Sequence, residues 1–350
     1  MWSCYKGNNC HTSCVCGSPA LKGSLLWSYD TGEKINVSPV ITDNILYIVT
    51  EEGILHALTG DGGNLLWKYN DTDEGNTAVE KFPPLVIDDT VYFTGKNGNI
   101  YALSSEKGEV KWVYETGSVI NSSPAIRGDM LYTGTLDGNI YAIDMSGGKK
   151  KWSFHAGGIC VSSPVIYGGM IFIGSDDIFY VIDIERGEKR WAYTLEKPVC
   201  SSPAIYNGAI YVSAGYIYCL EIINGAKRWI AEVEGEPLTE TPVIAANSIF
   251  VPTRVYMKEL DKTVGVLYSL EVNTAARQWA FFSWGSITEP AVSGNFMYAG
   301  SGDGKLYAID TGCGLQKWVY DTASIITSSP VVGEGCVFTV TNNGMIYAII

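Results

Sequence analysis

Residues 122–152, SSPAIRGDMLYTGTLDGNIYAIDMSGGKKKW, form one complete copy of a pattern that organises the 350-residue chain. In this copy Pro124 follows two serines, an aromatic residue, Tyr132, comes eight residues later, and Trp152 ends the stretch. Apolar residues alternate with others around Ile140 and Trp152, which is typical of strands with one buried face. Because Gly-containing turn signals separate these segments, the stretch predicts four short antiparallel strands.

The same pattern recurs along the whole chain, with successive tryptophans 38 to 50 residues apart. Each unit has a proline before its first strand and an aromatic residue eight positions later. We expect each tryptophan to lie over the hairpin between the third and fourth strands, where a glycine turns sharply, and to wedge against the neighbouring unit. The predicted docking tryptophans are Trp27, Trp67, Trp112, Trp152, Trp191, Trp229, Trp279 and Trp318.

The two ends of the repeat array complement each other. The last unit ends after its third strand, within residues 344–349, and lacks a fourth. Residues 24–29, which include Trp27, read as a fourth strand without the first three. We therefore predict an all-β fold, an eight-bladed β-propeller of four-stranded antiparallel blades, whose N-terminal strand completes the last blade. The predicted domains are a cysteine-rich appendage, residues 1–20, and the propeller, residues 21–350.

The recurring motif resembles that of a known family. The spacing of Ala142, Asp144, Gly148 and Trp152 is similar to the tryptophan-docking motif of the pyrroloquinoline-quinone (PQQ) repeat family, as is the serine pair before Pro164. The resemblance implies a β-propeller. The family includes quinoprotein dehydrogenases, the propeller lipoprotein of bacterial outer-membrane protein assembly, and extracellular sensor or interaction domains. The chain is closest in style to the non-catalytic members, such as the assembly lipoprotein.

Composition excludes several classes of function. The chain is 46% hydrophobic and 17% charged, so it can bury a large core and is not disordered. Its net charge of −13 disfavours binding to nucleic acid or anionic lipid. No apolar run is long enough for a transmembrane segment. Residues 1–20 lack the features of a secretory signal, so we expect a cytoplasmic protein, or an exported one if a leader was removed before Met1.

Four cysteines, Cys4, Cys10, Cys14 and Cys16, crowd the N-terminal appendage. Thiolates at this density suit zinc or an iron–sulfur cluster, so they are candidate metal ligands. They could equally form two disulfides in an exported protein, or stay free. Their spacing matches no standard paired metal motif, and these alternatives remain open.

One end of the predicted propeller carries the irregular features of the repeat. We call it the loop face: it holds the loops between the second and third strands, and those from each fourth strand to the next unit's first strand. Two long insertions, residues 71–82 and 253–265, fall here, and we predict a docking surface for a partner protein or a cation. Its candidate residues are Glu51, Glu52, Asp137, Asp176, Asp177, Glu240, Trp284, Glu289 and Asp303, with Trp284 as an exposed anchor.

Three functions follow as hypotheses. The first is a non-catalytic protein-interaction scaffold that presents the acidic loop face. The second is a subunit of a redox complex whose N-terminal cysteines hold an iron–sulfur cluster or zinc. The third is a PQQ-dependent dehydrogenase. Such enzymes commonly stack the quinone on a disulfide between adjacent cysteines and hold Ca²⁺ with carboxylate and amide oxygens. This chain has no Cys-Cys pair, so PQQ is not expected. We assign no catalytic residue, and we expect His56 and His155 to be packed or half-buried strand residues.

Overall fold

The computed structural model describes residues 14–15, 19–70, 82–95, 97–159, 162–199, 201–237, 241–333 and 335–350. These residues form strands, turns and loops, and none of them belongs to a helix that could cross a membrane. The chain divides into two compact units. Among the described residues, unit 1 comprises 14–70 and 233–350, and unit 2 comprises 82–232.

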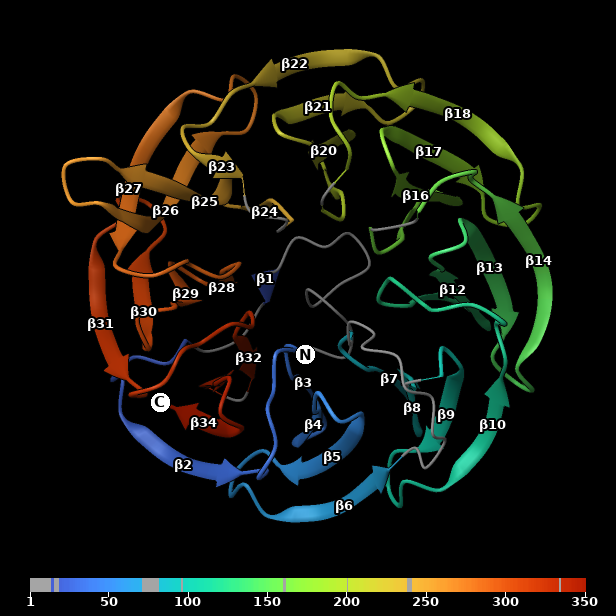
Figure 1. The fold of residues 1–350 in the computed structure, drawn as a ribbon, viewed down its shortest axis with the longest axis horizontal. Coiled ribbons are helices and arrows are strands. Elements are labelled where there is room, and N and C mark those ends of the chain that lie inside the picture. The colour runs from blue at the N-terminus through green and yellow to red at the C-terminus, as the bar shows by residue number, and fades with distance from the viewer. Residues whose placement is uncertain are drawn as a thin grey trace. The chain divides into compact units, whose positions relative to one another are not determined.

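Unit 1 contains four antiparallel sheets, each the blade of a propeller (Figure 1). Two of them carry one additional short strand, β1 or β23, at an edge. The strands of its first two blades are β2 (Leu25–Asp30), β32 (Val331–Gly333), β33 (Cys336–Val340), β34 (Met345–Ile349), β3 (Val40–Thr42), β4 (Ile45–Val49), β5 (Ile54–Thr59) and β6 (Leu65–Asn70). The strands of the other two are β23 (Glu236–Pro237), β24 (Val243–Ala245), β25 (Ser248–Met257), β26 (Lys262–Glu271), β27 (Arg277–Ser283), β1 (Cys14–Val15), β28 (Ala291–Ser293), β29 (Phe296–Gly300), β30 (Lys305–Asp310) and β31 (Gln316–Asp321).

Unit 2 also contains four blades, and each follows the chain order of its strands. The strands are β7 (Leu85–Ile87), β8 (Thr90–Thr94), β9 (Ile100–Ser104), β10 (Val110–Tyr114), β11 (Ala125–Arg127), β12 (Met130–Gly134), β13 (Asn139–Asp144), β14 (Lys149–His155), β15 (Val165–Tyr167), β16 (Met170–Ser175), β17 (Ile178–Asp183), β18 (Lys189–Thr194), β19 (Ala204–Tyr206), β20 (Ala209–Ser213), β21 (Ile217–Glu221) and β22 (Lys227–Ala231). The described residues therefore build eight blades, and the predicted all-β, eight-bladed propeller fold is confirmed.

The predicted closure is confirmed within unit 1. The N-terminal strand β2 pairs antiparallel with β34, with Leu25 opposite Ile349 and Trp27 opposite Ala348. The segment just before β2 also contacts the preceding blade, β28–β31, because the carbonyl of the buried Ala20 accepts hydrogen bonds from Tyr298 Oη (3.0 Å) and Trp318 Nε1 (3.1 Å). The last blade is thus completed by the first complete strand of the repeat array.

The repeat tryptophans connect neighbouring blades inside each unit, but not as the sequence predicts. We expected each indole to cover its own hairpin, and this detail is wrong. In unit 2, the Trp112 ring lies over Gly148 in the hairpin of the next blade, and Trp112 Nε1 donates to the Met145 carbonyl (2.7 Å). A Cβ atom at Gly148 would lie 2.7 Å from this ring, and the glycine has φ +64°, so both space and backbone conformation require glycine there.

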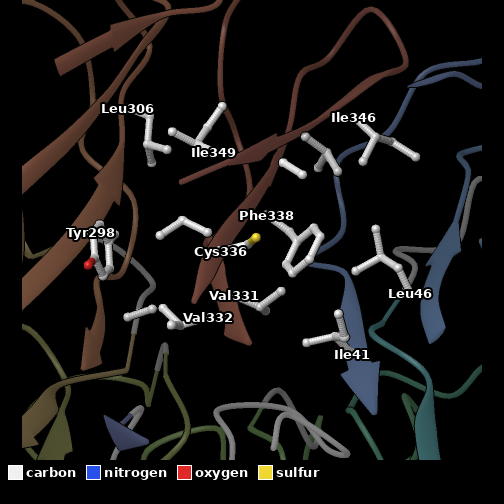
Figure 2. Close-up of a cluster of buried hydrophobic side chains, with 14 of the residues drawn as sticks. Ile41, Leu46, Tyr298, Leu306, Val331, Val332, Cys336, Phe338, Ile346 and Ile349 are labelled. Atoms are coloured by element: carbon white, nitrogen blue, oxygen red, sulfur yellow. The ribbon is translucent and has the colours of Figure 1, made fainter. Parts of the chain in front are cut away.

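The core of unit 1 lies between consecutive blades (Figure 2). Phe338 and Leu46, from the second strands of two neighbouring blades, are both fully buried in it. Cys336 is also buried there, and Cys219 is buried in unit 2, as expected for cysteines in apolar strands. Burial raises the pKa of the Cys219 thiol to about 11, so it stays protonated. Cys313, in contrast, is exposed.

Candidate functional site

The loop face of unit 1 is hollowed beside the hairpin formed by β25 and β26. The cavity has a volume of about 810 Å³. Three consecutive blades of unit 1 contribute to its walls, which makes it a feature of the assembled unit and not of one repeat. Its lining residues are Gly235, Arg254, Tyr256, Thr263, Gly285, Ser286, Gly302 and Ile325.

Close backbone contacts build the floor of this cavity. A Cβ atom at Gly285 would lie 2.3 Å from the Asp303 backbone nitrogen, so only glycine allows the two loops to approach this closely. The loops are also hydrogen-bonded, because Gly302 N–H donates to the Ser286 carbonyl (2.8 Å) and Ser301 Oγ donates to the Gly285 carbonyl (3.4 Å). The cavity therefore rests on a scaffold with little freedom to collapse.

The second long insertion extends the β25–β26 hairpin and forms one wall. Residues 253–265 lengthen the two strands, and the register places Arg254 opposite Gly265 and Tyr256 opposite Thr263. Because alternate strand residues point to the same side, Arg254 and Tyr256 share the face that lines the cavity. Tyr256 Oη donates to Asp261 Oδ1 (2.5 Å), and this hydrogen bond raises the pKa of Tyr256.

Exposed aromatic side chains occur on the hairpin and on the loop that follows β27. Trp284, which directly precedes the cavity residue Gly285, is 65% exposed, and Tyr256 is 60% exposed. Phe282, near the end of β27, is also more than half exposed. Large exposed aromatic residues beside a pre-formed hollow are typical of the anchoring residues of protein interfaces.

The predicted acidic residues of the loop face divide between the two units. Asp137, Asp176 and Asp177 are exposed in unit 2, whereas Glu51 and Glu52 are exposed in unit 1. Asp303 of unit 1 is partly buried, and Asp303 Oδ2 accepts a hydrogen bond from Tyr307 Oη (2.7 Å). That hydrogen bond and, above all, burial raise the pKa of Tyr307. Glu240 lies outside the described residues.

Glu289 does not belong to an exposed acidic surface, and its assignment there is wrong. Its side chain is buried, and its carboxylate accepts hydrogen bonds from the Thr241 backbone N–H and from Ser329 Oγ (3.4 Å). In unit 2 a serine occupies the same position before the proline: Ser163 Oγ accepts the Ser123 N–H at 2.9 Å. Glu289 therefore takes part in the same linkage between blades as these serines, with a longer side chain.

Two histidines of the repeat differ in their surroundings. His56 is buried in β5 at the position where other blades have tyrosine, and neither of its ring nitrogens has a hydrogen-bond partner among the described residues. Burial lowers the pKa of His56, with a further lowering by Lys68 that Glu33 opposes. His155 is exposed, contrary to expectation, and its Nδ1 lies 3.2 Å from Asn139 Oδ1.

The described residues leave the N-terminal cysteines untested as metal ligands. Cys4, Cys10 and Cys16 lie outside the described residues. The backbone of Cys14 belongs to β1, which pairs in parallel with β28. The N-terminal segment thus reaches the first strand of a blade in unit 1. Among the described side chains, no group of three His, Cys, Asp or Glu residues is placed to hold a metal ion.

Comparison with known proteins places this architecture in a family. The family model described as outer membrane protein assembly factor BamB matches residues 15–119 and 116–320. The chain belongs to this family of PQQ-repeat propellers. No curated protein sequence matches the chain at a significant level.

Solved structures with the same fold include BamB, a dehydrogenase and a designed protein. BamB from Moraxella catarrhalis is 17% identical, with a TM-score of 0.75 over 93% of this chain and 96% of that one. Quinohemoprotein alcohol dehydrogenase from Comamonas testosteroni is 14% identical, with a TM-score of 0.83 over 99% of this chain and 80% of that one. The computationally designed Ika8 protein is 16% identical, with a TM-score of 0.80 over 93% of this chain and 99% of that one. These similarities establish the fold.

The described cavity does not fit the quinone cofactor and Ca²⁺ that the dehydrogenases of the family imply. Its lining contains no carboxylate and no cysteine, and Arg254 is its charged member. The carboxylate ligands on which Ca²⁺ sites are usually built are therefore missing from the lining, and no step through a quinone follows from these residues.

Proposed function

We propose that the protein is an interaction scaffold whose loop face in unit 1 binds a partner protein. The observation that supports this most is the cavity of about 810 Å³ with Tyr256 in its wall and Trp284 beside it. A hollow built on fixed backbone contacts costs little ordering entropy when a partner binds, and exposed aromatic rings supply apolar area for contact. The family model's description, an assembly factor, supports a role in holding another protein.

The net charge of the chain favours a specific partner over indiscriminate binding. The chain carries a net charge of −13, so most of its surface repels acidic proteins and nucleic acid. The exposed Glu51 and Glu52 lie in the β4–β5 turn of the same unit, on its loop face. We infer that the partner is neutral or basic at its rim and inserts an apolar group beside Trp284.

Binding to aromatic variants tests this proposal. The immobilised protein is used to capture partners from an extract of its own cells, and the purified partner's affinity is then measured by calorimetry. Trp284→Ala and Tyr256→Ala should each weaken binding about tenfold or more. The matched control is Tyr167→Ala, an exposed tyrosine of the β15–β16 hairpin in unit 2. Unchanged affinity in both cavity variants would exclude this docking site.

The composition of the purified protein distinguishes the other two functions. Iron with acid-labile sulfide would support the redox-complex subunit, and bound quinone with Ca²⁺ would support the dehydrogenase. Zinc at one ion per chain would support an N-terminal appendage that is stabilised by metal, whether the protein is a redox-complex subunit or a dehydrogenase. The scaffold proposal expects captured partner protein and requires none of these groups.

A further inference from the structure

The two residues before each repeat tryptophan differ between blades. In six units at least one of them is Lys or Arg, for example Val110-Lys111 and Lys150-Lys151. In the other two units both residues are leucine: Leu25-Leu26 before Trp27, and Leu65-Leu66 before Trp67. These positions begin the outermost strand of each blade, where charged side chains normally protect an exposed strand edge from association.

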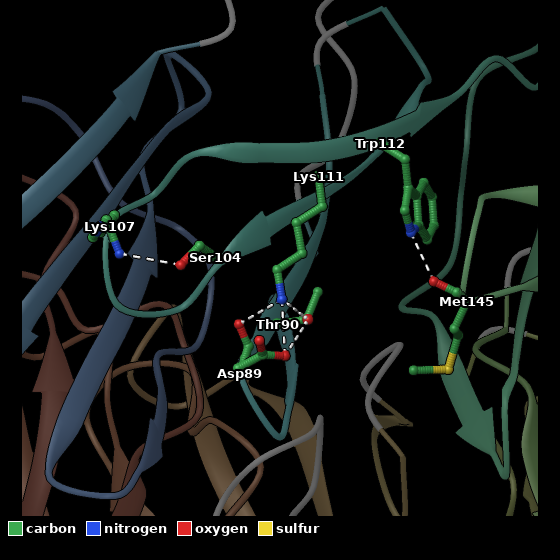
Figure 3. A network of polar contacts seen from close by, with 7 residues as sticks. All are labelled: Asp89, Thr90, Ser104, Lys107, Lys111, Trp112 and Met145. Atoms are coloured by element: carbon green, nitrogen blue, oxygen red, sulfur yellow. Dashed lines mark hydrogen bonds and ion pairs between the residues drawn. The ribbon is translucent and has the colours of Figure 1, made fainter.

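In four of these six units an acidic residue of the same blade pairs with the cation. Lys111 Nζ lies 2.8 Å from Asp89 Oδ1 and 2.6 Å from Thr90 Oγ1, while the neighbouring Trp112 binds Met145 (Figure 3). The pairs Arg190–Asp183, Arg228–Glu221 and Lys317–Asp310 are similar, with distances of 2.5, 2.6 and 3.0 Å. In these blades an ion pair thus lies at the solvent-exposed start of the outermost strand.

The two leucine blades lack both members of this ion pair. In three of these pairs the acid occupies the second position after the central residue of the third strand, as Asp310 does after Ala308, whereas Asp89 lies in the turn between β7 and β8. The corresponding residues in the leucine blades are Thr59, after Ala57, and Ile350, after Ala348. Loss of the anion together with the cation means that these blades replace a polar outer surface with an apolar one.

The leucines are exposed and lie on consecutive blades of unit 1. Strands β31, β2 and β6 follow one another along its outer edge in Figure 1. The exposed fractions range from 43% to 65% for the six leucines of this surface, which we call the leucine patch: Leu21, Leu25, Leu26, Leu65, Leu66 and Leu315. Half-buried indoles connect its parts, because Trp318 lies over Gly23 and Trp27 lies over Gly63.

A β-bulge explains why neighbouring leucines are exposed together. The register between β2 and β34 shifts between Leu25 and Trp27, so Leu26 has no residue opposite it. The same shift occurs between β5 and β6, beside Leu65. At a bulge two successive side chains can emerge on one side of a strand, and both leucines of each pair therefore reach solvent.

We propose that the leucine patch is the interface through which a second copy of this chain binds. Exposed apolar patches of this kind are uncommon on monomers and mark interaction sites. The protein's acidity repels a second copy elsewhere, and the leucine side chains themselves carry no charge. This interface is separate from the cavity site and does not rest on the proposed function.

The charges that flank β2 favour a two-fold arrangement. Lys22 and Asp30 are both exposed, one just before the strand and one at its end. When β2 of one copy lies antiparallel to β2 of the other, with Leu26 at the two-fold axis, each Lys22 faces Asp30 of the second copy. A self-complementary surface with an apolar centre and opposite charges at its two ends suits a two-fold dimer.

Sedimentation velocity of the full chain over a wide concentration range tests the dimer. The wild type should sediment with the mass of two chains. The double variant Leu25→Lys and Leu65→Lys should raise the dimer dissociation constant about tenfold or more. The matched control is Val110→Lys, at the same repeat position and with the same 45% exposure as Leu25, in unit 2. It should leave the dimer unchanged.

Charge variants test the antiparallel arrangement of the two β2 strands in the dimer. Lys22→Glu should weaken the dimer because it sets a like charge against Asp30 of the other copy, and adding Asp30→Lys should restore it. Since Asp30 Oδ1 also accepts the Gly32 N–H (2.8 Å), thermal melting must show that the variants are folded. If the Leu25→Lys and Leu65→Lys double variant is not folded, the milder Leu25→Ser and Leu65→Ser pair replaces it, with the same expected weakening.

Three results would overturn the proposal. The first is a wild-type protein that stays monomeric at every concentration. The second is a dimer that Val110→Lys dissociates as strongly as the leucine double variant does. The third is a monomer that floats with neutral phosphatidylcholine vesicles, which would assign the leucines to a lipid surface.

Discussion

Replacing two equivalent tryptophans by phenylalanine should have different effects on stability. Trp152 lies over Gly187, and its Nε1 donates to the Ile184 carbonyl at 3.1 Å. Trp191 lies over Gly225 in the same way, but its buried Nε1 has no partner among the described residues. Phenylalanine keeps an aromatic ring over the glycine in both cases, and it removes the indole N–H together with the same part of the larger ring, so the difference between the two variants reports the hydrogen bond.

The magnitudes follow from these contacts. Both variants lose the same buried ring area, which lowers the free energy of unfolding. Trp152→Phe also leaves the Ile184 carbonyl without its donor, whereas Trp191→Phe removes an unpaired buried donor, so Trp152→Phe should cost about 1 kcal/mol more than Trp191→Phe. Trp152→Ala also loses the ring contacts with Gly187 and Tyr132, and should cost about 3–5 kcal/mol.

Urea denaturation followed by circular dichroism measures all three variants against the wild type. Equal losses for Trp152→Phe and Trp191→Phe would show that the indole hydrogen bond does not contribute. A loss below about 1 kcal/mol for Trp152→Ala would show that the rings do not hold neighbouring blades together.

Four further predictions concern unit 1. His56→Tyr should stabilise the protein, because tyrosine at this position bonds a backbone carbonyl elsewhere, as Tyr180 does with Ala156 at 2.8 Å; a lower melting temperature would contradict this. Burial lowers the pKa of His56 below its usual 6.5, so on acidification the unfolded chain takes up this proton before the folded chain does. The stability of the wild type should therefore fall as the pH drops below about 6.5, and that of His56→Tyr should fall less steeply. An equal dependence of the melting temperature on pH in the two proteins would exclude this role. Deleting residues 1–30 removes the strand that pairs with β34 and should strongly lower the melting temperature, whereas deleting residues 1–13 should not; similar melts for the two deletions would argue against closure. Glu289→Ala leaves the Thr241 N–H unbonded and should cost about 1–3 kcal/mol in urea denaturation, with Glu289→Gln costing less; equal costs would show that no acceptor is needed there.

The repeat made most of the fold predictable. The spacing of the proline, aromatic and tryptophan residues fixes where each strand lies, and the missing fourth strand of the last blade implies the pairing of β2 with β34. The target of each indole could not be predicted. A glycine four residues before Trp152 is close in sequence, but the ring contacts Gly187, which is 35 residues away. Local spacing does not reveal contacts between blades.

The candidate site was only partly predictable. The length of insertion 253–265 and the position of Trp284 indicate the loop face, and the structure places both beside the cavity. Arg254 and Tyr256 were missed because they lie inside the insertion, where the repeat gives no register. Glu289 was misassigned because a charged residue next to a proline suggests a solvated turn. Its neighbours Thr241 and Ser329 come from other blades and bury it.

Hydrogen exchange of the protein with and without its captured partner tests the docking site most directly. The partner should slow amide exchange in residues 253–265 and 284–286, the hairpin and loop that border the cavity. Slowed exchange confined to other parts of the chain, with these two segments unchanged, would contradict the proposed docking site.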